Sequence, residues 1–369
     1  MTSQDLYPVS RLAAVQEATA ASGLDALLLT PGPDLRYVSG YQALPLERLT
    51  CLVVPAAGEP YMMVPRLELP AAQASPASRL GLEFVAWDET DDPYEIAAKR
   101  LGPAAKVGLA DRMWAMASLR FRSAMPGTEQ VLAGSVLREL RMRKSPAEVE
   151  ALRQAGEAID AVHRQVPGFL RPGRTEREVG RDIAEAILAA GHETVDFVIV
   201  ASGPNGASPH HELSDRVIQA GEPVVVDIGG QLHNGYCSDS TRNYCIGEPP
   251  AEYAAFFEVL RRAQDAACAA VRPGVSCESI DAAAREVIAE AGYGELFIHR
   301  TGHGIGIETH EEPYIVAGND EPMEPGFAFS VEPGIYRAGA HGARIEDILV
   351  CTESGGLRLN NTPRDLVVV

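Results

Sequence analysis

Positive charge is scarce in this sequence of 369 residues, which carries 32 lysines and arginines against 51 aspartates and glutamates. The formal net charge of −19 argues against a nucleic-acid partner, because such a partner requires a basic surface. Apolar runs of membrane-spanning length are also missing. Residues 1–8 lack the basic and apolar regions of a signal peptide, so we expect a cytoplasmic protein that does not bind membranes.

Cysteine and histidine are distributed unevenly along the chain. The six cysteines show no Cys-x-x-Cys spacing, which fits reduced thiols and leaves no structural zinc motif. All nine histidines lie at or after His163. We therefore expect the chemistry in the C-terminal part of the chain and a structural or substrate-limiting role for the N-terminal part.

Several common catalytic motifs are absent as well. The sequence has no Gly-x-Ser-x-Gly elbow, no His-Glu-x-x-His helix, no Gly-Lys-Ser/Thr phosphate loop and no strand-linked Gly-x-Gly-x-x-Gly fingerprint. The chemistries that depend on these motifs therefore have little support.

The length and the hydrophobic patterning indicate two domains. Residues 8 to about 140 alternate helical and strand patterns, which predicts an α/β domain over residues 1–143. Ser145-Pro146-Ala147-Glu148 has the form of a capping box with Pro at the first helical position, so a second domain, residues 144–369, is expected to open with a long helix. In that domain the patterns predict helices at 175–190, 251–271 and 276–291 and strands at 195–201, 223–229, 235–246, 296–299, 327–332 and 344–351.

The stretch Arg300–Glu311 is rich in glycine, and it contains or adjoins three histidines, His299, His303 and His310. Three glycines within five positions let the backbone approach a neighbour closely, and a bound ion or ligand is the first candidate for that neighbour. A glycine-rich turn that merely carries histidines is the alternative, because so short a motif produces many false matches.

Four acidic residues lie in or directly after short apolar runs of the kind that form buried strands: Asp227, Asp239, Glu332 and Glu346. Unpaired carboxylates are rarely buried, because removing such a charge from water is costly. Only Arg344 is a nearby cation in the sequence, so a pair of divalent metal ions would satisfy the whole set. Four carboxylates with one imidazole suit manganese or cobalt better than a thiolate-rich zinc site would.

The order of these residues resembles that of the pita-bread dinuclear metallopeptidases, most closely Xaa-Pro dipeptidase (prolidase) and Xaa-Pro aminopeptidase. The segment Ser-Gly-Pro-Asn-Gly-Ala-Ser-Pro-His-His at 202–211 carries the same resemblance, and residues 24–41 are similar to the opening of a creatinase-type N-terminal domain. The resemblance implies an α/β N-terminal domain followed by an α+β pita-bread catalytic domain. That catalytic domain would be a pseudo-symmetric curved antiparallel sheet backed by helices.

The resemblance also implies how the metal ions are held. Asp239 and Glu346 would bridge two divalent ions, while Asp227 would hold one ion and His303 with Glu332 the other. The ions would be manganese, with cobalt or zinc as alternatives. Because the family's paired ions activate a bridging water, that water would attack the peptide bond.

Further residues match family positions around the substrate. His210, His299 and His310 would handle protons or substrate as catalytic residues, since imidazole titrates near neutrality. Arg344 matches a family arginine near the site and is expected to bind substrate. The free carboxylate of a dipeptide needs a further cation, and we choose Arg48 because the N-terminal domain of related dimeric enzymes reaches toward the partner's active site. A solvated Arg48 paired with Glu47 is the alternative.

The sequence departs from the family pattern between Asp227 and Asp239, which stand one residue farther apart. The tight-turn signal Asn234-Gly235 lies between them, so a lengthened hairpin loop or a bulge can absorb the extra residue. If it is not absorbed, Asp239 points to the opposite face, because a slip of one residue reverses every side chain of a strand.

The resemblance therefore implies a homodimeric enzyme that hydrolyses the Xaa-Pro peptide bond, preferentially in dipeptides. An aminopeptidase that removes the N-terminal residue from longer peptides is the alternative. A metal-free creatinase-like hydrolase or a non-catalytic binding protein on the same fold is expected to lose ligands or proton-handling histidines, and this sequence keeps both sets.

Overall fold

The computed structural model describes residues 6–369, and the chain divides into two compact units, Met1–Arg141 and Met142–Val369. The boundary expected from the sequence, between residues 143 and 144, lies two residues farther along. Among the described helices, none is long and apolar enough to cross a membrane.

The N-terminal unit is built on a six-stranded mixed sheet in the order β4-β3-β2-β1-β5-β6. Strand β2 runs antiparallel to β1 and β3, and the other pairs are parallel. Every residue of β1, β2 and β3 is buried, which is why these strands read as continuous apolar runs in the sequence. The strands are β1 Ala26–Leu29, β2 Cys51–Pro55, β3 Tyr61–Pro65, β4 Glu83–Trp87, β5 Lys106–Leu109 and β6 Glu129–Leu132.

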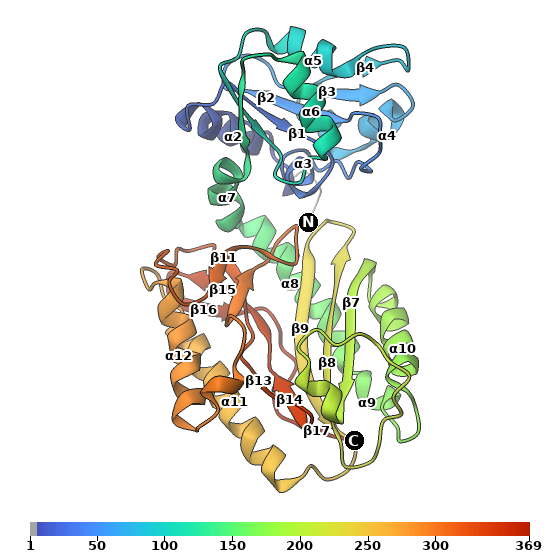
Figure 1. The fold of residues 1–369 in the computed structure, drawn as a ribbon, viewed down its shortest axis with the longest axis vertical. Helices are drawn as coiled ribbons and strands as arrows, with labels where there is room; N and C mark the ends of the chain where they lie inside the picture. The colour runs from blue at the N-terminus through green and yellow to red at the C-terminus, as the bar shows by residue number, and fades with distance from the viewer. Residues whose placement is uncertain (1–5) are drawn as a thin grey trace. The chain divides into compact units, whose positions relative to one another are not determined.

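Helices complete this unit and confirm the expected α/β class (Figure 1). Helix α5 illustrates the local signals: Asp92 caps its N-terminus by accepting from the amides of Tyr94 and Glu95, and Gly102 ends it with a φ of +76°. The helices are α2 Val9–Ala21, α3 Pro33–Ser39, α4 Leu69–Ala74, α5 Pro93–Leu101, α6 Ala115–Ala124 and α7 Gly134–Met142, with a 3₁₀ turn at Pro76–Arg79.

The C-terminal unit has two halves, each a sheet backed by helices (Figure 1). In the first half the sheet order is β17-β9-β8-β7, antiparallel apart from β17, which runs parallel to β9. Its elements are α8 Pro146–His163, α9 Val166–Phe169, α10 Glu176–Ala189, β7 His192–Ser202, β8 Pro223–Leu232, β9 Cys237–Cys245 and β17 Val367–Val368, with a 3₁₀ turn η2 at Gly203–Ala207. The capping box predicted at the start of α8 is present, with Ser145 and Glu148 each accepting from the other's backbone amide.

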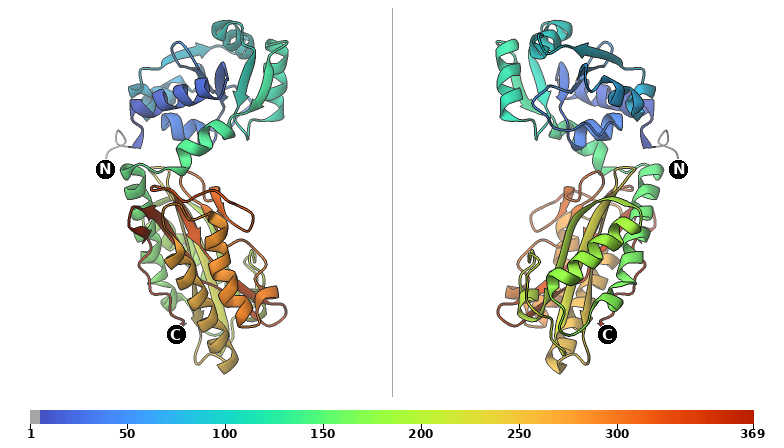
Figure 2. Two further views of the ribbon diagram at one scale, coloured as in Figure 1. Left: turned by 90° about the vertical axis from the view of Figure 1, so that its left-hand side faces the viewer. Right: turned by 90° about the vertical axis from the view of Figure 1, so that its right-hand side faces the viewer.

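In the second half the sheet order is β11-β10-β12-β15-β16, antiparallel throughout, with a separate hairpin β13-β14 beside it. Its elements are α11 Ala251–Ala270, α12 Cys277–Glu290, η3 Gly294–Leu296, β10 Gly302–Gly304, β11 Glu311–Ile315, β12 Ala328–Val331, β13 Gly334–Arg337, β14 His341–Arg344, β15 Asp347–Thr352 and β16 Gly355–Arg358. Figure 2 shows α10 covering one side of the unit and α11 with α12 covering the other.

Strand alternation decides which side chains meet the helices. Val224, Val226 and Ile228 of β8 pack in one apolar core with residues of α8 and α10, so the odd-numbered residues point to the opposite face. Phe329 and Val331 of β12 pack in a second core with α11 and α12 in the same way. The faces of both sheets that turn away from the helices are therefore free to carry polar residues.

The strand predicted at 296–299 is wrong. Residues 294–296 form a 3₁₀ turn, and the strand begins only at Gly302. The carbonyls of Phe297 and His299 accept hydrogen bonds from the guanidinium of Arg285 on α12 rather than from a neighbouring strand. The side chain of a residue 12 to 14 positions earlier has taken the place of the strand pairing that the local apolar pattern predicted.

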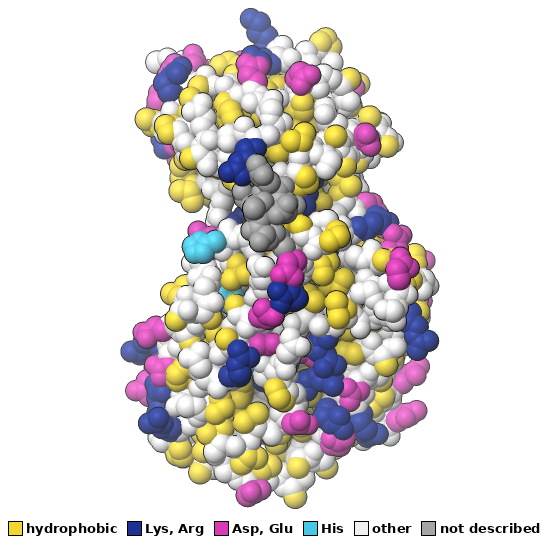
Figure 3. All heavy atoms as spheres, turned by 180° about the vertical axis from the view of Figure 1, so that it is seen from behind, with side chains coloured by type: hydrophobic (Ala, Val, Ile, Leu, Met, Phe, Trp, Pro, Cys, Tyr) yellow, Lys and Arg dark blue, Asp and Glu magenta, His cyan; other side chains and the backbone are white. Residues whose placement is uncertain are grey.

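Charged side chains of both signs are interspersed on the face of the C-terminal unit seen in Figure 3. On the helices, exposed pairs follow the i, i+3 and i, i+4 spacing, such as Arg261 with Glu258 (2.7 Å) and Asp265 (3.0 Å) on α11. Pairs of this kind contribute little, about 0.2–1 kcal/mol each, because water and salt screen them.

Arg242 on β9 presents the opposite case, because it is almost fully buried. Its guanidinium donates to Asp347 Oδ1 (2.6 Å) and to the carbonyls of Glu346 (2.6 Å), Thr362 (2.9 Å) and Pro363 (3.0 Å). It thereby ties the start of β15 and the C-terminal segment to β9.

Replacing Arg242 by Met should lower the free energy of unfolding by about 3 kcal/mol, because Asp347 and several carbonyls lose a buried donor. Arg261→Met removes an arginine of an exposed pair and should change the value by less than about 1 kcal/mol. Urea unfolding followed by circular dichroism gives both numbers. Equal losses for the two variants would show that the buried cluster does not stabilise the fold in this way.

Candidate metal centre

The hairpin β8–β9 places two of the predicted metal ligands on one face. Its register runs without a shift from Pro223 opposite Cys245 to Gln231 opposite Cys237. Asp239 stands opposite Gly229, two residues along the strand from Asp227, so both aspartates point to the same side.

The extra residue of the hairpin lies in its turn. Leu232 accepts from the amide of Gly235, whose φ of +94° only glycine adopts readily, and the amide of Leu232 donates to the carbonyl of Tyr236. Because the turn absorbs the extra residue, the strands pair without a bulge and Asp239 points to the same face as Asp227.

The second sheet brings three more ligands to the same place. Val331 of β12 pairs with Asp347 of the antiparallel strand β15. The next position of the same register sets Glu332 opposite Glu346. On the other edge of β12, Gly304 pairs with Phe329, which sets His303 opposite Ser330, and the amide of His303 donates to Ser330 Oγ (3.0 Å). His303 therefore projects from the same face of the sheet as Glu332.

The glycines of this segment let its backbone pack closely against neighbouring parts of the protein. A Cβ on Gly302 would lie 1.9 Å from the carbonyl oxygen of Ser330, and one on Gly304 would lie 2.1 Å from that of Glu312. A Cβ on Gly306 would meet Glu311 Oε1 at 2.6 Å. The close approach of this backbone is thus to neighbouring protein atoms, mainly strand backbone.

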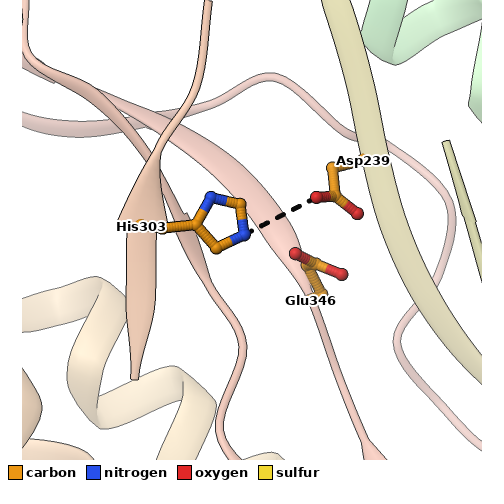
Figure 4. Close-up of side chains that lie close together, drawn as sticks. All are labelled: Asp239, His303 and Glu346. Carbon is orange, nitrogen blue, oxygen red and sulfur yellow. Dashed lines mark ion pairs between the residues drawn. The ribbon is translucent and has the colours of Figure 1, made fainter. Parts of the chain in front are cut away.

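Asp239, His303 and Glu346 point toward one another, and each offers a ligand atom within 4.8 Å of the other two (Figure 4). His303 Nε2 lies 3.6 Å from Asp239 Oδ2 and 3.3 Å from Glu332 Oε1. The other ring nitrogen, Nδ1, lies 3.0 Å from the carbonyl oxygen of Gly304. A proton on Nδ1 would donate to that carbonyl and leave the Nε2 lone pair directed at the carboxylates, which is the usual arrangement of a metal-binding histidine.

The pKa values of the clustered carboxyl groups show that a bound positive charge would stabilise their ionised forms. Burial and the charges of neighbouring carboxylates raise the pKa of Asp239 and of Glu346 well above their usual values. Burial, only partly offset by Arg344, raises the pKa of Glu332 to about 7. Asp227 Oδ1 is buried, and no residue among 6–369 gives it a hydrogen bond. Divalent cations would balance the charges of these carboxylates and coordinate the unsatisfied oxygen of Asp227. The residues present therefore fit a metal centre.

Histidine 303 fits the same centre. Burial, and after it the neighbouring His310, lowers the pKa of His303 to about 3, so the imidazole stays neutral and can ligate a metal at neutral pH.

Arg344 lies among the ligands and is buried. Its guanidinium donates to Asp227 Oδ2, to the hydroxyl of Tyr336 (2.8 Å) and to Thr241 Oγ1 (3.2 Å). Thr241 in turn donates to Glu346 Oε2 (2.7 Å). These contacts let Arg344 orient the carboxylates, and substrate binding by Arg344 stays a prediction from the sequence.

The five predicted ligands, Arg344 and all three predicted catalytic histidines line one cleft of about 1170 Å³. His210 is exposed there, and the ring of His310 lies with its centroid 4.0 Å from that of His303. His299 differs, since Nδ1 lies 2.7 Å from the carbonyl oxygen of Arg300 and Nε2 lies 2.9 Å from the hydroxyl of Tyr336. Burial, and then the charge of Arg344, lowers the pKa of His299 to about 4.

The structure also brings an arginine to the cleft that we did not single out. Arg300 lines it, with the guanidinium carbon 4.3 Å from the ring centroid of Tyr314, and no carboxylate pairs with it among residues 6–369. The sequence indicates Arg300 only through its position three residues before His303. Arg48 lies in the N-terminal unit, where Glu47 (3.0 Å) and Glu68 (3.3 Å) pair with it.

Comparison with known proteins gives the same grouping as the geometry. Residues 150–353 match the sequence pattern of metallopeptidase family M24, and residues 11–143 match the creatinase/prolidase N-terminal domain. The chain is 56% identical to the probable dipeptidase PepE of Mycobacterium tuberculosis over 97% of this chain and 96% of that protein. It is 34% identical to the Xaa-Pro dipeptidase of Lactobacillus helveticus over 96% and 98%.

The crystal structure of dipeptidase PepE from Mycobacterium ulcerans superimposes with a TM-score of 0.92, at 56% identity, over 98% of this chain and 97% of that one. Because the family pattern covers more than half of the sequence and the relatives align over nearly their whole length, this chain belongs to metallopeptidase family M24.

Proposed function

We propose that this enzyme is an Xaa-Pro dipeptidase that hydrolyses the bond before proline with the help of two divalent metal ions. The observation that carries the proposal is the convergence of four carboxylates and one neutral imidazole on one cleft. The names of the relatives, dipeptidase and Xaa-Pro dipeptidase, support the substrate class.

Asp227, Asp239, His303, Glu332 and Glu346 would hold the ions. When bound, such ions lower the pKa of a water and polarise the scissile carbonyl. Four oxygen donors and one nitrogen donor favour manganese, with cobalt or zinc as alternatives. Arg344 and Thr241 keep the carboxylates oriented, and this support distinguishes a usable centre from a cluster of mobile acids.

We assign the proton and substrate steps to His210 and His310. Both line the cleft, and burial lowers the pKa of His310, so its ring is neutral at pH 7 and can accept a proton. His299 has both ring nitrogens engaged, so we give it a positioning role through Tyr336 and Arg344 in place of direct catalysis.

The carboxylate end of the substrate requires a cation. Arg300 lines the cleft, and its guanidinium packs on the ring of Tyr314. A guanidinium in this place can bind the carboxylate of a substrate through two parallel hydrogen bonds. Arg48 stays the second choice, because it already has Glu47 and Glu68 as partners.

An aminopeptidase that acts on longer peptides is the alternative function. A hollow of about 400 Å³ shares Arg177, Val198 and Leu213 with the cleft, so a longer chain has room to continue along the surface. A homodimer in the cytoplasm stays a prediction from the sequence.

Asp239→Ala and Glu346→Ala should abolish turnover of an Xaa-Pro dipeptide and lower the bound metal, because each removes a ligand that the ions share. Glu252→Ala, a change at an exposed acid on α11, should leave both unchanged. Metal analysis with kinetics checks this, and chelation should also lower the melting temperature, since the carboxylates then repel one another. Full activity of the chelated protein would contradict the proposal.

His210→Ala and His310→Ala should each lower kcat by about two to four orders of magnitude, the usual worth of acid–base help, with metal content retained. Steady-state kinetics and metal analysis on the same samples measure both quantities. Loss of metal from His310→Ala would mean that this histidine is a ligand.

Arg300→Ala should raise KM for dipeptides by about 10- to 100-fold, which corresponds to one hydrogen bond to a charged group, and should spare tripeptides. Arg48→Ala is the comparison, and a larger effect there would return the assignment to the N-terminal unit. Equal cleavage of Xaa-Pro and Xaa-Pro-Yaa by the unmodified enzyme would instead favour the aminopeptidase.

A further inference from the structure

Glu176, in the first turn of α10, is a fully buried carboxylate that lies outside the metal cluster and does not line the cleft. It accepts hydrogen bonds from five donors: the amide and hydroxyl of Ser202 (2.8 Å each), Asn205 Nδ2 (3.0 Å), Ser214 Oγ (2.5 Å) and His211 Nε2 (2.7 Å). All of these donors belong to one segment, residues 202–214.

The segment 202–214 carries His210 to the cleft. Ser208, Pro209 and His210 line the cleft, and the residues that bind Glu176 stand on both sides of them in the sequence. The anchored residues are Ser202 and Asn205 before this stretch and His211 and Ser214 after it. A single carboxylate therefore closes the segment into a loop whose tip projects into the cleft.

The opposite side of the segment rests on β14. A Cβ on Gly342 would lie 2.1 Å from the carbonyl oxygen of Gly206, so the two backbones touch. Strand β14 ends at Arg344, which orients the metal ligands. Between this contact and Glu176, the segment has a fixed place relative to the metal centre.

The carboxylate of Glu176 is held ionised. Burial alone would raise its pKa, but hydrogen bonds from Ser214, Ser202 and His211 lower the pKa below its usual value. An ionised acceptor binds each donor more strongly than a neutral one. An amide of the same shape would turn an NH₂ group toward donors on one side, and several of these bonds would be lost.

We propose that Glu176 is a positioning residue that fixes His210 in the cleft by anchoring the segment 202–214 through His211, Asn205, Ser202 and Ser214. The catalytic consequence rests on the proposed role of His210, whereas the anchoring itself can be tested without it.

The anchoring is tested by proteolysis with a glutamate-specific protease. Glu212 is exposed within the segment, so Glu176→Gln should accelerate cleavage after Glu212 by about tenfold or more, as expected for the loss of hydrogen bonds to a charged group. Glu185→Gln, at an exposed position of the same helix, should cleave like the unmodified protein. Unchanged cleavage of Glu176→Gln, with fragments identified by mass, would overturn the proposal. If Glu176→Gln does not fold, Asn205→Ala and Ser214→Ala each remove one donor and give the same readout.

The catalytic consequence is tested by a double-mutant cycle with His210→Ala. Glu176→Gln should lower kcat by about tenfold in the unmodified background, with metal content retained, and should have no further effect once His210 is gone. Additive losses would show that Glu176 acts on stability and not through His210. Full turnover by His210→Ala would instead overturn the proposed role of His210, while the proteolysis still decides whether Glu176 holds the segment.

Discussion

Repulsion among four clustered carboxylates, three of them buried and Glu332 partly exposed, is the constraint on which the C-terminal unit depends. Asp227, Asp239, Glu332 and Glu346 carry four negative charges when ionised, and Arg344 supplies one positive charge among them. A protein selected for stability alone would replace such a set with apolar residues, because burying unbalanced charge is destabilising. Bound cations would balance these charges. Without them the carboxylates lower the free energy of unfolding, which is a cost in stability that a functional site can impose on a fold.

Strand alternation is what makes this set compatible with a packed protein. The same period of two that buries Val226 and Ile228 against the helices sends Asp227 to the opposite face, and β12 repeats the arrangement with Val331 and Glu332. Each sheet needs helices on one face only, which leaves the other face for ligands. The extra residue of the β8–β9 hairpin is tolerated because it lies in the turn, where it changes neither the pairing nor the alternation.

This alternation also explains what the sequence could predict. Acidic residues inside apolar runs indicate from local pattern alone the face where the carboxylates meet, and the capping box at Ser145 marks the start of α8. The strand wrongly predicted at 296–299 and the contacts of Glu176, which the sequence did not indicate, both depend on partners outside the local segment. Arg285 removes the carbonyls of residues 297 and 299 from any strand, and the donors of Glu176 lie 26 to 38 residues away. No periodicity within a segment reports contacts of this kind.

The two kinds of functional residue are held in different ways. The proposed metal ligands stand on or beside β8, β9, β10, β12 and β15, whose pairing fixes them, whereas the proposed catalytic residues His210 and His310 stand on connections between strands. Connections tolerate changes of sequence and length better than paired strands do. Substrate preference can therefore change while the metal centre is retained, provided that each connection keeps an anchor of its own. For the segment that carries His210, the buried carboxylate of Glu176 supplies that anchor, because its bonds reach the chain on both sides of the histidine.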